Sequence, residues 1–114
     1  MKEGNPEIRV GGGKFDTGKK WIDASGAPHV IYQKALSVGA FPNATLKNVA
    51  HGEALNVVSK YTNVVALWGS DGTTVKTLAS SGVTVDITAT NVAITTAANL
   101  STTINGVVVI EFCL

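Results

Sequence analysis

Apolar and polar residues alternate along much of the chain, and this period of two is the pattern of half-buried β-strands. The pattern is clearest in Val83–Thr88, where Val83, Val85 and Ile87 alternate with polar residues. The segment Asn91–Thr95 repeats it. No window carries an apolar stripe at helical spacing over three turns. The pattern therefore predicts an all-β fold.

The same pattern predicts about eight short strands, separated by turns rich in Gly, Pro, Asn, Asp and Ser. Their expected ranges are 20–23, 29–36, 45–50, 56–68, 73–78, 83–88, 91–95 and 107–112. A single helical turn is expected at 53–55. Strands this short at regular spacing are typical of a sandwich or barrel, and we expect an antiparallel β-sandwich of the jelly-roll type.

Two of the expected strands depart from simple alternation. In Asn56–Trp68 the apolar positions change phase near Lys60 to Asn63, which predicts a bulge or a bend there. The segment Val107–Phe112 is apolar on both faces, so we expect it to be a central strand or a strand at an interface.

The N-terminal segment differs from the rest in being polar and rich in glycine. We expect residues 1–18 to form a flexible arm and residues 19–114 to form the β-sandwich domain. Two interpretations of the arm remain open. It is either a disordered tail or an arm that orders on a neighbouring subunit, with Ile8, Val10 and Phe15 as anchors.

Length and charge narrow the classes of function. The 114 residues predict one domain with a core of its own. Only 15% of the residues are charged, against about 25% in an average domain, which is typical of β proteins and of proteins covered in an assembly. The net charge of +1 and the lack of a basic run argue against nucleic-acid binding. Without a long apolar stretch or an apolar signal-peptide core, we expect no membrane insertion and synthesis in the cytoplasm.

The residues that catalysis would need are few. The two histidines, His29 and His51, lie in different segments, and no nucleophile-elbow motif is present. We expect His29 at a strand edge and His51 hydrogen-bonded to backbone or to a neighbouring subunit. Cys113 continues an apolar run and is expected to be a buried, inert thiol. The sequence thus predicts no catalytic residue and a protein that is not an enzyme, although catalytic groups can also meet in space.

The sequence also contains no complete motif for a cofactor or a metal ion. Residues 13–20 read GKFDTGKK and nearly match a phosphate-binding loop, but Lys20 stands where a hydroxyl is needed and no helix is expected after it. Asp71 lacks the further acidic residues of a calcium loop, and His51 with Glu53 is a poor pair of metal ligands. We therefore expect neither a cofactor nor a metal.

Aromatic residues offer a second kind of binding. The candidates for stacking on a sugar ring or on a partner are Trp21, Tyr32, Phe41, Tyr61 and Trp68. Most are expected in the core, while Trp68 precedes a turn and is expected at a surface. Exposed aromatics in a concave site would make the chain a monomeric carbohydrate-binding, lectin-like module, which is the alternative function.

Four short motifs carry a resemblance to a known family. They are Gly18–Asp23 (GKKWID), Ile31–Lys34 (IYQK), Gly39–Asn43 (GAFPN) and Val49–Gly52 (VAHG). Their order and spacing resemble a small β domain of bacteriophage virion proteins of the tail-fibre, baseplate or head-fibre type, over roughly residues 18 to 112. The chain departs from that pattern in a longer turn at 24–30 and in Phe41, where the family has leucine.

The resemblance implies a non-enzymatic structural protein of the virion, joined to tail or capsid proteins through the arm. Two forms of such a protein stay open: a fibre that contacts a host surface glycan, and a protein that decorates the capsid. In this family Trp21 and Tyr32 would pack in the hairpin, Pro42-Asn43 would form a turn and His51-Gly52 would end a strand. No binding site is carried over. We expect a homotrimer, because the apolar last strand could be buried against two further copies.

Overall fold

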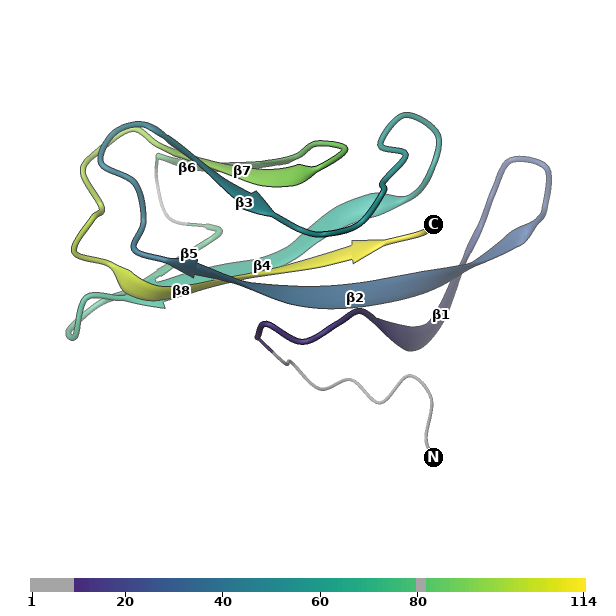
Figure 1. Cartoon of the computed structure of the whole chain (residues 1–114), viewed down its shortest axis with the longest axis horizontal. Coiled ribbons are helices and arrows are strands. Elements are labelled where there is room, and N and C mark those ends of the chain that lie inside the picture. The colour runs from purple at the N-terminus through teal and green to yellow at the C-terminus, as the bar shows by residue number, and fades with distance from the viewer. Residues whose placement is uncertain (1–9, 80–81) are drawn as a thin grey trace.

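The computed structural model describes residues 10–79 and 82–114, and within these ranges it is all-β, with no helix (Figure 1). The eight strands are β1 (Phe15–Ile22), β2 (Pro28–Gly39), β3 (Leu46–Ala50), β4 (Thr62–Ser70), β5 (Val75–Thr77), β6 (Val83–Ile87), β7 (Asn91–Thr96) and β8 (Ile104–Phe112). The described residues accordingly contain no helix long and apolar enough to cross a membrane. The expected all-β class is confirmed.

The strands form two antiparallel sheets that face each other (Figure 1). One sheet has five strands in the order β1-β2-β8-β4-β5, and the other has three in the order β3-β7-β6. This arrangement confirms the expected β-sandwich. The sheets hold five and three strands, and the jelly-roll form of the sandwich is not confirmed.

The hairpin of β1 and β2 is longer than the sequence predicted. Phe15 already pairs with Gln33, and Trp21 pairs with His29 next to the turn. The expectation that the arm extends to residue 18 was therefore wrong for residues 15–18, which belong to β1. Val10 also forms an isolated bridge to Ala35 of β2. The part of the arm that includes Ile8 lies outside the described residues.

Strand β8 is the centre of the five-stranded sheet. It pairs with β2 on one side and with β4 on the other, so Phe112 lies opposite both Tyr32 and Thr62. Its residues from Gly106 to Phe112 are all buried. This confirms a central strand. The residues that bury β8 belong to the same chain, and the homotrimer remains an untested prediction.

Strand β4 begins later than expected. Asn56–Lys60 forms a turn in which the Asn56 side-chain oxygen accepts hydrogen bonds from the backbone N–H groups of Val58 and Ser59. A local side-chain bond of this kind competes with strand pairing and ends the extended pattern. The chain bends at Lys60, which confirms the bend expected near Lys60 to Asn63, and the register of β4 against β8 shifts between Val64 and Ala66. No helical turn forms at 53–55.

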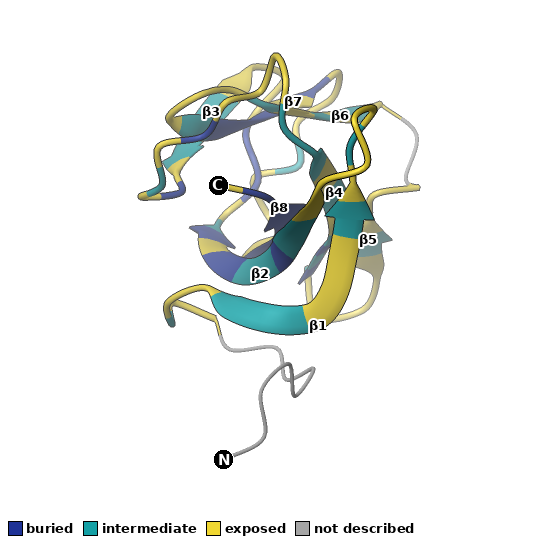
Figure 2. Ribbon diagram, turned by 90° about the vertical axis from the view of Figure 1, so that its right-hand side faces the viewer, coloured by how far each residue is buried: buried dark blue, intermediate teal, exposed yellow. Residues whose placement is uncertain are grey.

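The main core fills the space between the sheets. Phe41, Phe112, Leu67 and Ile94 are among its fully buried side chains, and Figure 2 shows buried residues on β2, β7 and β8. A second, smaller cluster lies on the outer face of the five-stranded sheet and consists of Ala35, Val107 and Val109 with Ala66 and Trp68 packed against them. The five-stranded sheet is thus apolar on both faces near its centre.

Candidate functional site

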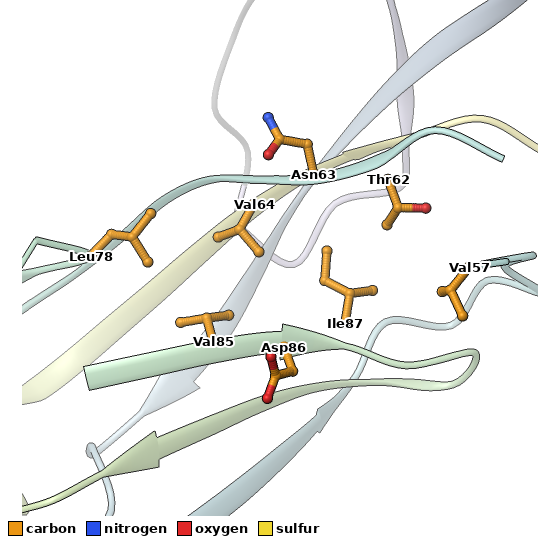
Figure 3. Close-up of a pocket in the computed structure, with 8 residues that line it drawn as sticks. All are labelled: Val57, Thr62, Asn63, Val64, Leu78, Val85, Asp86 and Ile87. Carbon is orange, nitrogen blue, oxygen red and sulfur yellow. The ribbon is translucent and has the colours of Figure 1, made fainter. Parts of the chain in front are cut away.

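An open groove lies between the two sheets, at the side where β4 and β6 are the neighbouring strands (Figure 3). Its volume is about 450 Å³. The groove is lined by five aliphatic residues, Val57, Val64, Leu78, Val85 and Ile87. Thr62, Asn63 and Asp86 complete its lining. Figure 3 shows Val64 above and Val85 and Ile87 below, all directed into the space between the strands.

The groove exists because neither sheet closes on this side. β5 pairs only with Trp68–Ser70, so no described strand pairs with Thr62–Ala66 on the side of β4 away from β8. β6 pairs with β7 and with no other described strand. A groove of aliphatic side chains with one carboxylate at its rim can hold apolar polypeptide, but it offers no pair of groups for proton transfer.

His51 is buried and both of its ring nitrogens are occupied. Nε2 lies 3.0 Å from the carbonyl oxygen of Thr88, and Nδ1 accepts a hydrogen bond of 3.2 Å from the backbone N–H of Glu53. Since Nδ1 accepts, Nε2 carries the proton and donates it to Thr88. The ring joins the segment after β3 to the turn between β6 and β7, which confirms the expected bonding to backbone.

His29 lies on the hairpin beside its turn. Its Nε2 is 2.8 Å from Oδ2 of Asp23, and its ring centroid is 5.0 Å from that of Trp21. The Asp23 Oδ1 atom accepts hydrogen bonds from the backbone N–H groups of Ser25 and Ala27. The hydrogen bond with His29, followed by those within the turn, holds the pKa of Asp23 far below its usual value of 3.8. These contacts close the turn and keep the hairpin in register.

Glu111 is a buried carboxylate that the sequence analysis did not single out. It lies on the outer face of β8, and Lys19 Nζ contacts its two oxygens at 3.2 and 3.0 Å. Gln33 and Tyr61 lie 3.4 and 3.5 Å from the same carboxylate. In the sequence, Glu111 could have been recognised as the one charged residue inside the otherwise apolar run 107–112. These partners satisfy the carboxylate within the fold, as a buried charge requires.

A second ion-pair cluster joins the two halves of the sandwich. Lys34 Nζ of β2 lies 3.1 Å from Glu53, which follows β3, and Lys14 Nζ lies 3.7 Å from the same carboxylate. Lys34 also donates to the carbonyl oxygen of His51. The described residues contain no group of three or more His, Cys, Asp and Glu side chains that could hold a metal ion.

The five aromatic residues do not gather at one place. Phe41 is in the core, and Tyr32 packs against Phe112 with ring centroids 6.1 Å apart. Trp21 lies on the hairpin, while Trp68 lies partly exposed on the outer face of the sheet. None of them lines the groove. The concave aromatic site of a sugar-binding module is therefore not found in this groove.

The remaining motifs have structural explanations. The phosphate-loop-like residues from Phe15 to Lys20 are part of β1, so no helix N-terminus follows them. The Asp71 carboxylate accepts hydrogen bonds from the backbone N–H groups of Thr73 and Thr74 and closes the turn between β4 and β5. Cys113 is buried, and burial raises the pKa of its thiol.

Comparison with known proteins adds no assignment. No family model, no curated protein and no solved structure matches this chain.

Proposed function

We propose that this chain is a non-enzymatic structural protein of a bacteriophage virion that works through contacts with other virion proteins. The observation that carries the proposal is the groove between β4 and β6, which is aliphatic and bordered by strand edges without a described neighbour. Such a surface suits polypeptide contacts rather than chemistry on a small substrate.

The arrangement of polar side chains supports the same proposal. His51, Glu53 and Glu111 each have partners inside the fold, and these partners connect strands or close loops. The resemblance to virion proteins, which rests on the order of the motifs GKKWID, IYQK, GAFPN and VAHG, is a further support for the proposal. The proposal has two forms. In the first, the N-terminal segment attaches the chain to the tail and the chain contacts the host surface. In the second, the chain decorates the capsid.

Purified particles of the phage that encodes the chain provide the test. An antibody against the chain should label the particles at one location in electron microscopy, and the chain should be present at a constant copy number per particle. Particles from a phage in which the gene carries an early stop codon are the control. Purified wild-type particles without the chain would contradict the proposal.

A further inference from the structure

The four edge strands of the sandwich are not equally protected against pairing with another chain. β1 carries Lys19 and Lys20 and an irregular register, β3 carries Lys47, and β5 has 3 residues. Lysines, irregular register and short length are the usual ways in which an edge strand avoids further pairing. β6, Val83–Ile87, has 5 residues in regular register and contains neither lysine nor proline. Among the described strands, only β7 pairs with β6, so the outer edge of β6 has no described strand beside it.

The hydrogen bonds at the two ends of the β6–β7 pair show which backbone groups face this outer edge. Thr88 donates to the carbonyl oxygen of Asn91, and Ala97 donates to that of Gly82. In an antiparallel pair the bonded residues alternate, so Thr84 and Asp86 are bonded to β7 as well. Val83, Val85 and Ile87 alternate with these bonded residues, so their N–H and C=O groups point away from β7 to the outer edge.

We propose that two copies of this chain associate through β6, in antiparallel pairing about a two-fold axis at Val85. In this register Val85 lies opposite Val85 of the second copy, and Val83 lies opposite its Ile87. Every outward-facing N–H and C=O group of β6 then has a partner, which makes roughly six hydrogen bonds between the chains. The two three-stranded sheets become one continuous sheet with β6 of each copy at its centre.

The side chains on the solvent face suit this register. Asp86 is the one charged residue of β6, and it lies opposite Thr84 of the second copy rather than opposite Asp86. Directly opposed pairs that are not hydrogen-bonded through the backbone have their side chains close together, so the threonine hydroxyl can donate to the carboxylate. The pairing therefore contains two favourable Thr–Asp contacts and no opposed like charges.

The side chains on the inner face suit it too. Val83, Val85 and Ile87 pack toward the core, and the last two line the groove. Residues that lie opposite each other in a sheet share a face, so the same side chains of the second copy project on the groove side. The pairing extends the apolar surface beside the groove. This inference does not depend on the function proposed above, since a virion protein can lack this contact.

Two substitutions at Thr84 test the register, because Thr84 is exposed and lies opposite the only charge of β6. Thr84→Lys should lower the dimer dissociation constant and Thr84→Asp should raise it, each by about tenfold at low salt, since every dimer contains the contact twice. Sedimentation equilibrium of the full chain measures both constants. The same two changes at Thr102, an exposed residue of the loop before β8, are the matched controls and should shift the constant less than about twofold.

Val85→Pro tests the backbone contact independently. The Val85 N–H points away from β7, so proline removes a bond between chains without removing one inside the chain. We expect the dissociation constant to rise by at least about tenfold, while the circular dichroism spectrum stays that of a β-sheet protein. A third variant, Thr84→Cys with Asp86→Cys, should form a covalent dimer on oxidation, and neither single change should.

The proposal is overturned if the full chain is monomeric at millimolar concentration. It is also overturned if both Thr84 variants shift the constant in the same direction, or if an oligomer forms that none of these changes affects. None of these outcomes contradicts the proposed virion function. Conversely, if the chain is absent from the phage particle, the proposed pairing through β6 is not contradicted. The two proposals can therefore fail separately.

Discussion

Single polar residues hold the loops of this sandwich in place, and His51 is the clearest case. Its side chain is only 1% exposed, and it bonds to two backbone groups that belong to different segments. The sequence predicted backbone bonding for this histidine, but it did not identify the partners. The partner Thr88 is far away along the chain, so only the folded structure brings it to the ring.

His51→Ala should lower the free energy of unfolding by about 2–4 kcal/mol, because it leaves a cavity in place of a buried ring and removes the partner of two backbone groups. Urea unfolding followed by fluorescence measures this. The control is His29→Ala on the hairpin, whose effect should stay within about 1 kcal/mol because its hydrogen bond with Asp23 is near the surface. Equal effects of the two changes would contradict the role assigned to His51.

Asp23 makes stability depend on pH in a defined direction. Its carboxyl pKa is lowered in the folded state, first by the hydrogen bond with His29. The stability that this carboxylate contributes is therefore present above the unfolded-state pKa, near 3.9, and is lost as the pH falls below it toward the folded-state pKa. The advantage of the wild type over Asp23→Asn should shrink progressively below about pH 4.

Unfolding by urea at a series of pH values from neutral to strongly acidic measures this advantage. Asp71→Asn should show the same trend, since backbone N–H groups in its turn also lower the pKa of Asp71. A constant difference between wild type and Asp23→Asn over the whole series would show that the turn does not hold the charged form.

At the scale of the elements, the close contact between β2 and β8 requires a residue without a side chain. A Cβ atom added at Gly106 would lie 2.8 Å from the carbonyl oxygen of Gly39 and 2.8 Å from Cε1 of Phe41. Gly106 and Gly39 are also paired across the two strands. The sequence contains many glycines, and only the pairing of β2 with β8 shows that Gly106 is at a point of close approach.

Gly106→Ala should therefore destabilise the protein by about 1–3 kcal/mol, because the methyl group overlaps backbone and a fully buried ring. Thermal unfolding by calorimetry measures the loss. Gly13→Ala is the matched control, since a Cβ atom there meets nothing within 4 Å, and its effect should be within about 0.5 kcal/mol. A neutral Gly106→Ala would mean that β2 and β8 can separate locally.

The elements also show how far alternation predicts strands. Val83–Ile87 and Asn91–Thr96 match their expected ranges closely, because both strands alternate and are bounded by turn residues. The expected start of β4 at residue 56 was wrong, since Asn56 bonds to the backbone ahead of it and forms a turn. Local side-chain bonds of this kind overrode the apolar pattern.

At the scale of the whole molecule, the sheet topology joins distant parts of the chain. The first long strand, β2, pairs with the last, β8, and Tyr32 lies opposite Phe112. β8 also supplies the partner for β4, so the five-stranded sheet cannot form before the end of the chain is in place. Closing such long loops before any pairing forms is costly in entropy.

Folding should accordingly be slow for a chain of this size, with a relaxation time in the range of milliseconds to seconds. Stopped-flow dilution from urea, followed through Trp21 and Trp68, measures it. Relaxation in microseconds would contradict the topology. The measurement is made at low protein concentration, so that association of two copies does not contribute.

The sequence by itself determined the all-β class, most of the strands and the structural character of His51, because alternation and turn chemistry act over a few neighbouring residues. Only the tertiary structure decided that β8 lies between β2 and β4, that Lys19 contacts Glu111, and that β6 is an edge strand of its described sheet beside an apolar groove. Strand order and register come from pairings between residues far apart along the chain. A local pattern contains no information on which distant strand will lie beside it.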